Sequence, residues 1–235
     1  MARGFDVASS TFASVLRLGA GLRAHPAARQ PAKLLELYEF EACPFCRRVR
    51  EALSVLDLDA MVYPCPRGGT RWRPRVVDAG GKERFPYLVD PNTGRSMYES
   101  ADIVDYIGAT YGGAGAPVWL GPLAVASGGL AAAVRAGHGR AARPSSPPGK
   151  PLELWSFEAS PYCRLVREAL CELELPYVLH NVAKGSPKRE AFVARSGRMR
   201  VPYLVDPNAA EGEPARAGIF ESADIVRYLG RYASA

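Results

Sequence analysis

The chain has 235 residues, a length that suits one large domain or two small ones. Its composition, 48% hydrophobic and 23% charged, is that of an ordinary globular protein, and no run of 18 apolar residues predicts a membrane span. The net charge of +6 comes from scattered arginines, and the densest group, Arg67, Arg71, Arg73 and Arg75, is expected to form a solvated face. Dedicated nucleic-acid binders concentrate charge more strongly, so we expect no nucleic-acid partner.

Five cysteines and three histidines narrow the chemistry further. An odd number of cysteines in a chain of this length is not typical of a secreted disulfide framework, and it favours a reducing compartment. Cys43 and Cys46 form the one Cys-x-x-Cys motif. A four-ligand zinc site therefore lacks its second ligand pair, and we expect no metal.

The first half of the chain predicts alternating strands and helices. A helical pattern over 11–23 is basic enough to suggest a targeting peptide, but it also has a later counterpart, described below. A strand over 34–40 leads into a helix over 45–56, whose apolar residues recur at helical spacing. The later elements are a strand (59–65), a loop or short helix (68–78), a strand with a tight turn (84–94), a returning strand (96–98) and a helix opened by 99–102 with Ser100 as its N-cap.

The middle of the chain predicts a partly helical linker. Residues 112–117 are rich in glycine, alanine and proline, and residues 118–143 hold apolar and small side chains of helical character. Residues 144–149 (PSSPPG) predict a turn or a flexible spacer.

The second half repeats the first. Ser160 matches Cys43 at an offset of 117, a strand over 152–157 precedes a helix over 162–173, and a strand over 177–182 follows. The segments 201–208 and 219–226 mirror 85–92 and 97–104. Each half therefore has the order β-α-β-(α)-β-β-α, with sheet faces covered by helices. We predict two domains, 1–115 and 116–235.

The repeat extends upstream of each first strand. The sequence RLGAG at 17–21 matches RAGHG at 135–139, at an offset of 118. A segment that recurs in both halves belongs to the folded unit, so we favour a folded segment over a targeting peptide at 11–23.

The stretch around Cys43 carries the chemistry. An apolar strand runs into Cys-Pro-Phe-Cys at the start of an amphipathic helix, where backbone N–H groups and the helix dipole stabilise a thiolate and Arg47 and Arg48 add positive charge. Such settings lower a cysteine pKa from about 8.5 to between roughly 3.5 and 7.5. We predict that Cys43 is the nucleophile of thiol–disulfide exchange and that Cys46 resolves the mixed disulfide. A pair of ordinary buried cysteines is the alternative.

The second copy has lost this nucleophile. Ser160 stands in place of Cys43, and serine does not exchange disulfides, so Cys163 is expected to be an inert buried thiol. Cys65 and Cys171 have no partner motif and are expected in the core.

Three motifs together resemble a known family: CPFC at the first strand–helix junction, FPYLVDPNTG with a proline opening the third strand, and YESADIV opening the last helix. They resemble the thioredoxin fold and, more narrowly, its glutathione S-transferase N-terminal and glutaredoxin branch. The whole chain resembles tandem proteins of photosynthetic organisms that carry two such domains. The resemblance covers roughly 34–111 and 151–233. It implies an α/β fold of two tandem thioredoxin-like domains and location in the chloroplast, with a chain that begins after any transit peptide.

The resemblance also implies glutathione as the co-substrate. In the family, the peptide bond before the strand-opening proline is cis, and the residue before it pairs through its backbone with the cysteinyl part of glutathione. A glutamate and a serine at a helix N-terminus hold the γ-glutamyl end, where the dipole favours a carboxylate. A hydroxyl near Ser160 activates the glutathione thiol in some transferases. The matching residues here are Phe85, Pro86, Glu99, Ser100, Ser160, Val201, Pro202, Glu221 and Ser222. A plain strand-opening proline and a simple helix cap are the alternative interpretations.

The sequence therefore favours a glutaredoxin-like, glutathione-dependent thiol–disulfide oxidoreductase that acts on disulfide or glutathionylated substrates through the dithiol of the first domain. A conjugating transferase is one alternative, although such enzymes add a long helical domain and only about 40 residues separate the two units here. A non-catalytic glutathione-binding or scaffold protein is another, which Ser160 favours. Iron–sulfur binding through Cys43 and glutathione is a third.

Overall fold

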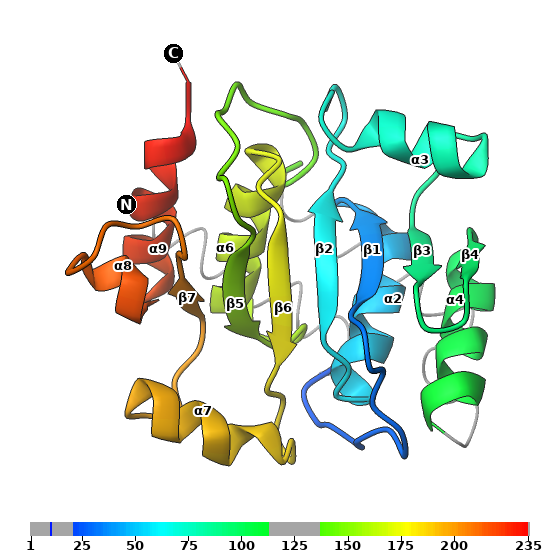
Figure 1. Cartoon of the computed structure of the whole chain (residues 1–235), viewed down its shortest axis with the longest axis horizontal. Helices are drawn as coiled ribbons and strands as arrows, with labels where there is room; N and C mark the ends of the chain where they lie inside the picture. Colours follow the sequence, from blue (N-terminus) through cyan, green and yellow to red (C-terminus); the bar gives the residue numbers. More distant parts are fainter. Residues whose placement is uncertain (1–9, 11–20, 113–136, 235) are drawn as a thin grey trace.

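One continuous sheet of eight strands runs through the computed structural model, which describes residue 10 and residues 21–112 and 137–234 (Figure 1). The strand order is β4-β3-β1-β2-β6-β5-β7-β8, so the two halves of the chain meet at β2 and β6. Within each half the first two strands are parallel and the third pairs antiparallel with the first. This is the predicted α/β arrangement of two thioredoxin-like units.

Within residues 21–112, the first unit contains four strands and three α-helices. They are β1 (Leu35–Glu39), α2 (Pro44–Val55), β2 (Ala60–Pro64), α3 (Arg73–Gly80), β3 (Tyr87–Asp90), β4 (Arg95–Met97) and α4 (Ser100–Ile107), followed by a π-helical turn (Gly108–Gly112).

The second unit repeats this order with one addition. Its elements are β5 (Leu152–Ser156), α6 (Pro161–Glu172), β6 (Tyr177–Asn181), α7 (Lys188–Ser196), β7 (Tyr203–Val205), the extra short helix α8 (Pro214–Ala217), β8 (Ile219–Phe220), α9 (Ser222–Leu229) and a 3₁₀ turn (Gly230–Tyr232). Helix α8 lies between β7 and β8, in the hairpin that corresponds to the one between β3 and β4.

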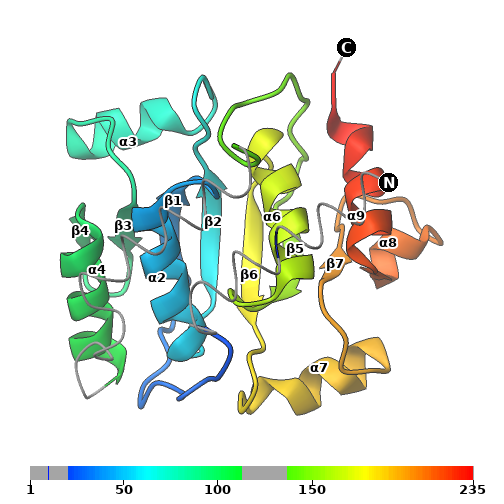
Figure 2. The ribbon, with the colours of Figure 1, turned by 180° about the vertical axis from the view of Figure 1, so that it is seen from behind.

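Helices α2, α4, α6 and α9 lie on one face of the sheet (Figure 2), whereas α3 and α7 lie at opposite ends of it. Strand β1 shows why both faces are covered, because successive side chains point to opposite sides of a strand. Leu35 and Leu37 pack with Leu53 of α2, whereas Tyr38 packs with Trp72 at the start of α3. The second unit has equivalent clusters under α6 and α7.

The joint between the units is nearly symmetric. Strand β2 pairs antiparallel with β6, and the central pair is Met61 with Val178. These two residues are 117 positions apart, which is the repeat offset, so equivalent positions of the two units face each other across a local two-fold axis. The pairing removes an exposed edge from each unit.

Two segments cross the joint and tie the units together. Residues 21–24 bond to Lys184 of the second unit, through Lys184 N–H to Leu22 O (2.9 Å) and Ala24 N–H to Lys184 O (2.7 Å). Residues 139–142 make the equivalent bonds to Arg67 of the first unit. Gly21 and Gly139 have φ of +79° and +70°. The predicted upstream repeat is therefore confirmed at its described ends, while residues 11–20 and 135–136 lie outside the described residues.

Four predictions need correction. Residues 137–143 form a turn and an isolated bridge and not a helix, because Gly137 and Gly139 both have positive φ; residues 113–136 of the linker lie outside the described part of the chain. The cluster around Arg71 is only partly a solvated face. Arg71 is half-buried and donates to Ser145 O (2.8 Å) and Glu174 O (3.0 Å), so it ties the first unit to the second. The other two corrections concern Arg47 and Ser100 and are given with the site.

Among the helices that the structure describes, none combines the length and the apolar character that crossing a membrane requires.

Candidate functional site

Cys43 is the N-cap of α2. Its backbone is extended (φ −80°, ψ 121°), and Pro44, which has no N–H to leave unsatisfied, opens the helix. The Cys43 Sγ accepts the N–H of Cys46 at 3.3 Å, the bond by which an N-cap side chain satisfies the first turn. The sequence Cys-Pro-Phe-Cys thus builds its own anion site at the end of β1.

The two thiols have opposite acidities. Hydrogen bonding from the Cys46 thiol, supported by backbone N–H groups of Cys46 and Phe45, lowers the pKa of Cys43 below its ordinary value, although burial opposes the shift. Burial raises the pKa of Cys46 well above its ordinary value. Cys43 retains 5% of its surface and Cys46 none. The pair therefore consists of a more acidic thiol that keeps a small exposed surface and a fully enclosed thiol of lower acidity, the asymmetry that disulfide exchange requires.

Arg47 does not contribute as predicted. Its guanidinium is buried against Glu51 at 3.1 Å and Glu158 at 3.6 Å, so carboxylates balance its charge. The hydrogen bonds at the helix start, and not arginine charge, are the main cause of the acidity of Cys43.

A cavity of about 240 Å³ lies beside the start of α2. It is lined by Phe45, Arg84, Phe85, Pro86, Glu99 and Ser100. The four residues that the resemblance assigns to glutathione in the first unit therefore line one cavity. Phe45, which lies between the two cysteines, lines it as well. The Phe85–Pro86 peptide is cis, as predicted.

Glu99 and Ser100 lie at the start of α4. Glu99, and not Ser100 as predicted, is the N-cap, and Ser100 is the first helical residue and is buried. Glu99 adopts φ +63°, a region that residues with side chains rarely occupy and that clusters at functional sites. Its carboxylate pairs with Arg84 at 2.7 Å, and both side chains are exposed.

The second unit preserves this framework without the nucleophile. Ser160 is the N-cap of α6, and its Oγ accepts the N–H of Cys163 at 3.3 Å. The Val201–Pro202 peptide is cis, and Glu221 has φ +66° and pairs with Arg200 at 2.9 Å. Ser222, like Ser100, is the first residue of its helix. Ser10 lies against this helix start, where its hydroxyl donates to Pro161 O at 2.9 Å.

The remaining cysteines are buried, as predicted. Cys65, Cys163 and Cys171 expose at most 1% of their surface, and burial raises the pKa of Cys65 and Cys171. Cys171 also accepts the Glu41 N–H at 3.4 Å and donates to Gly139 O at 3.3 Å, so it helps to hold the joint between the units.

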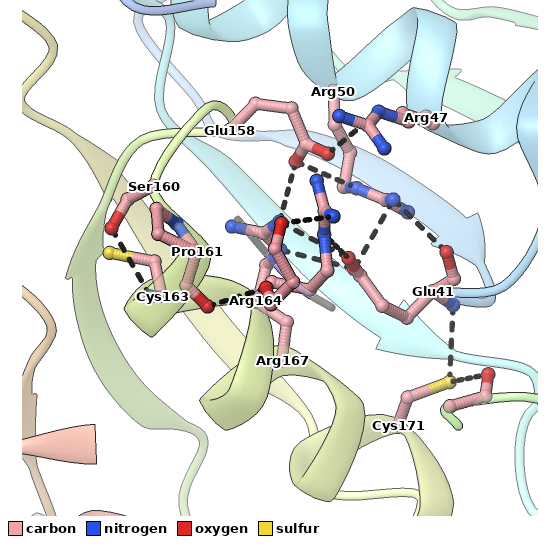
Figure 3. A network of polar contacts seen from close by, with 12 residues as sticks. Glu41, Arg47, Arg50, Glu158, Ser160, Pro161, Cys163, Arg164, Arg167 and Cys171 are labelled. Atoms are coloured by element: carbon pink, nitrogen blue, oxygen red, sulfur yellow. Dashed lines mark hydrogen bonds and ion pairs between the residues drawn. The ribbon is translucent and has the colours of Figure 1, made fainter. Parts of the chain in front are cut away.

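A network of buried ion pairs fills the joint between α2 and α6 (Figure 3). Arg50 of the first unit pairs with Glu39, with Glu41 at 3.2 Å and with Glu158 of the second unit at 3.1 Å. Arg167, the equivalent of Arg50, pairs with Glu158 at 2.9 Å and Glu41 at 3.0 Å. Each arginine is thus shared by carboxylates from both units.

Sequence reasoning missed this network and Arg84. The signal was a repeated Arg-x-x-Arg-Glu, at Arg47–Glu51 and again at Arg164–Glu168, on the helix side that a solitary domain would expose to solvent. Arg84 precedes Phe85-Pro86 and has its equivalent in Arg200. Both signals become visible only when the two repeats are aligned.

Within the described ranges, no three His, Cys, Asp or Glu side chains are placed so that they could hold a metal ion.

The fold and the site define a chain of two tandem thioredoxin-like units, of which one carries a Cys-x-x-Cys dithiol at a helix start. The family model for the glutathione S-transferase N-terminal domain matches residues 37–115 and again 154–235, more than half of the chain. The chain therefore belongs to the glutathione S-transferase N-terminal domain family, which supports a glutathione-related function.

A search of the curated proteins found no match to the chain. Among solved structures, the chain is similar to Leishmania TDR1, described as a unique trimeric glutathione transferase, with 15% sequence identity. The alignment covers 87% of this chain and 68% of that chain, with a TM-score of 0.29. At that score the similarity adds nothing to the fold assignment.

Proposed function

We propose that the protein is a glutathione-dependent thiol–disulfide oxidoreductase whose dithiol, Cys43 and Cys46, lies in the first unit. The observation that carries the proposal is the Cys43 sulfur at the start of α2, where it accepts the Cys46 N–H next to a cavity lined by the residues predicted to hold glutathione.

The cavity suits one end of a tripeptide. Its volume of about 240 Å³ is below the 300–1,000 Å³ typical of pockets that enclose a drug-sized ligand. It would hold the γ-glutamyl end of glutathione and leave the rest exposed. The ligand ammonium would replace Arg84 as the partner of Glu99, and the ligand carboxylate would meet Arg84 and the backbone N–H groups at the start of α4.

The reaction follows from the two acidities. The Cys43 thiolate attacks the glutathione sulfur of a glutathionylated substrate, a new S–S bond forms, and the substrate leaves as a thiolate that takes a proton from solvent. Cys46 then attacks the Cys43 sulfur, which releases glutathione and leaves a Cys43–Cys46 disulfide. Two further molecules of glutathione reduce that disulfide and are themselves oxidised to the glutathione disulfide.

The second unit cannot carry out this exchange, since Ser160 replaces the nucleophile. Its cis-proline and its Glu221-Ser222 pair favour glutathione binding without turnover, and a Ser160 hydroxyl bonded to a bound glutathione thiolate would suit a conjugating transferase instead.

The test is turnover of a mixed disulfide of glutathione and 2-mercaptoethanol. We expect Cys43→Ser to lower the rate by at least about 100-fold, because no thiolate remains at the helix start. Cys46→Ser separates the mechanisms: it retains activity if free glutathione resolves the intermediate, and loses it if Cys46 is required.

The matched control is Cys163→Ser, which removes the buried thiol at the position equivalent to Cys46 and is expected to leave turnover unchanged. Undiminished activity in Cys43→Ser would overturn the proposal. Conjugation of glutathione to a panel of electrophiles, lost in Ser160→Ala, would favour the transferase.

A further inference from the structure

Three arginines lie around the turn that carries the nucleophile: Arg48, Arg67 and Arg140. Arg67 and Arg140 are exposed, and Arg48 is half-buried, with a buried Nε that has no hydrogen-bond partner. Among the described residues, none of the three has an ion-pair partner. None of them lines the cavity that is predicted to hold glutathione. Their positive charge is therefore available to a partner outside the cavity.

Backbone hydrogen bonds place Arg67 and Arg140 on the side of Cys43 that faces the second unit. Strand β1 leads to Cys43, and β2, its parallel neighbour on that side, leads to Arg67. The N–H of Arg67 donates to Arg140 O at 2.6 Å. Ala42, the residue before Cys43, donates its N–H to Gly139 O at 3.3 Å. In Figure 1 the loop after β2 and the segment that leads into β5 lie at the same end of the sheet.

The cavity lies on the other side of Cys43. Its lining residues Phe85 and Pro86 precede β3, which pairs with β1 on the side away from β2. Arg48 lies three positions after Phe45, another cavity residue, so these two side chains are neighbours on α2. A mixed disulfide whose glutathione occupies the cavity therefore points its other half toward the arginines.

Other arginines at this end of the sheet have their charge balanced by carboxylates. Three such pairs are present: Arg73 with Glu83, Arg84 with Glu99 at 2.7 Å and Arg143 with Glu172 at 3.5 Å. These pairs add little net charge. The unpaired Arg48, Arg67 and Arg140 therefore give the surroundings of the nucleophile a positive field, which attracts anionic partners.

We propose that Arg48, Arg67 and Arg140 form a docking surface for an acidic segment of a protein substrate, whose glutathionylated cysteine is attacked by Cys43. Carboxylates beside the modified cysteine pair with the guanidinium groups, while the cavity holds the glutathione. This inference rests on the proposed function and names its substrate class, which is glutathionylated proteins with acidic residues next to the modified cysteine.

The exchange step fits this arrangement. The Cys43 sulfur forms a bond to the glutathione sulfur, and the bond from glutathione to the substrate sulfur breaks with its electron pair leaving on the substrate as a thiolate. That thiolate leaves on the side of the arginines, where positive charge stabilises it. A nucleic acid has the same sign of charge as an acidic segment, but it offers no disulfide to Cys43.

The second unit supplies a matched control. Its equivalent backbone bridge joins Lys184 and Arg23, both of which are exposed. They belong to the unit that lacks a nucleophile. Removing their two charges changes the net charge of the chain by as much as removing Arg67 and Arg140, but at a distance from the redox centre.

Turnover of three glutathionylated peptides by the full chain tests the inference. Each peptide has one glutathionylated cysteine with two residues on each side of it, and these four residues are glutamate, glutamine or lysine. The value of kcat/KM for release of the peptide thiol, with glutathione as reductant, is measured at two ionic strengths. These are about 0.01 M and about 1 M, where the Debye length is about 30 Å and about 3 Å.

In the wild type at low ionic strength, the glutamate peptide should exceed the glutamine peptide in kcat/KM by at least about fivefold, because one exposed ion pair is worth up to about fivefold. The lysine peptide should be slower than both. At the high ionic strength the preference for glutamate should shrink to about twofold or less, because salt screens exposed charges.

The double variant Arg67→Gln/Arg140→Gln should lower the preference at low ionic strength to about twofold or less. The control Arg23→Gln/Lys184→Gln should keep the wild-type preference. Arg48→Leu, which copies the residue at the equivalent position of the second unit, should lower it in part. The preference compares two substrates on one enzyme, so a general loss of activity cancels.

Equal kcat/KM for the glutamate and glutamine peptides in the wild type would overturn the inference, as would an equal loss of preference in the two double variants. A single-stranded oligonucleotide should not inhibit turnover. Inhibition that Arg67→Gln/Arg140→Gln relieves would assign the surface to nucleic acid instead.

The proposed function is tested separately by the mixed disulfide of glutathione and 2-mercaptoethanol, whose leaving thiol has no neighbouring charge. Turnover of that compound without a preference among the peptides would leave the proposed function standing and overturn the docking surface. Failure to turn over both the compound and the peptides would refute the proposed function itself. The two failures are therefore distinguishable.

Discussion

Cys43 and Ser160 occupy the same position in two copies of one turn. Each caps its helix from an extended backbone, each accepts the N–H of the residue three positions on at 3.3 Å, and each exposes 5% of its surface. At this position the two helix starts thus differ by a sulfur in place of an oxygen, set in nearly the same backbone.

Ser160→Cys should therefore create a second reactive thiol. The N–H of Cys163 and the start of α6 would stabilise its thiolate and hold its pKa below the ordinary value of about 8.5. Alkylation with iodoacetamide at neutral pH should label one fast-reacting cysteine in the wild type and two in the variant. Ser156→Cys, at a fully buried position inside β5, is the control and should add no fast-reacting thiol. A new thiol in Ser160→Cys that titrates at 8.5 or above would contradict the prediction.

At the scale of elements, the segment 139–142, which crosses between the two units, needs a glycine at position 139, where its backbone lies very close to neighbouring side chains. The Gly139 carbonyl accepts from Cys171 Sγ, as the Gly21 carbonyl accepts from Ser54 Oγ at 3.0 Å. A Cβ on Gly139 would lie 2.7 Å from the Cβ of Glu41 and 3.3 Å from the Cα of Glu168. The segment therefore packs directly against both units where the buried ion pairs begin.

Gly139→Ala should lower the free energy of unfolding by about 2–5 kcal/mol. A positive φ costs a residue with a side chain about 1–2 kcal/mol, and overpacking costs about 1–3 kcal/mol. Gly212→Ala is the control, because Gly212 also has positive φ (+87°) but no atom lies within 4 Å of its added Cβ. Urea unfolding monitored by circular dichroism measures both. Equal losses in the two variants would show that the close approach does not matter.

At the scale of the whole molecule, the sheet and the ion pairs make the two units interdependent. The pairing of β2 with β6 leaves β4 and β8 as the edges of the sheet, and these strands are only three and two residues long. Short edges offer little backbone for further pairing. The joint buries carboxylates whose protonation should then govern the stability of the entire chain.

Stability should fall on both sides of about pH 4.5. Burial opposes the shift, but Arg167 and Arg50 lower the pKa of Glu158 to about 2. The stability that ionised Glu158 contributes is therefore present above its pKa in the unfolded chain, near 4.5, and is lost as pH falls through 2. Glu39 has the opposite sign: its folded pKa of about 7 means that its contribution is full below pH 4.5 and is lost as pH rises through 7.

The urea midpoint, measured at a series of pH values between 3 and 8, tests both the loss of stability toward acid (the acid limb) and the loss toward neutral pH. Glu158→Gln should flatten the acid limb, and Glu39→Gln should flatten the decline toward pH 7. An acid limb of unchanged slope in Glu158→Gln would assign acid unfolding to other carboxylates.

Much of each unit could be predicted from its own sequence. Periodicity and turn residues located the strands and helices to within a few residues, because those signals are local. The Cys-Pro-Phe-Cys turn followed from its motif, and the cis peptides and four of the six cavity residues followed from the family resemblance. The pairing of β2 with β6 and the sharing of Arg50 with Glu158 could not be predicted this way, since they join residues more than 100 positions apart. Ser100 was misplaced as the N-cap because Glu99 adopts a positive φ that the sequence does not signal.

The local two-fold axis through Met61 and Val178 has a further consequence. An interface of this kind is what two identical subunits form when they dimerise, and in such a homodimer every substitution occurs twice. A Glu39 in both copies would place a second buried carboxylate beside Arg50 and Arg167. Joining the copies in one polypeptide lifts that constraint, so one copy keeps Glu39 and Cys43 while the other carries Ser156 and Ser160. Covalent linkage is thus what allows a symmetric scaffold to hold a single, asymmetric redox centre.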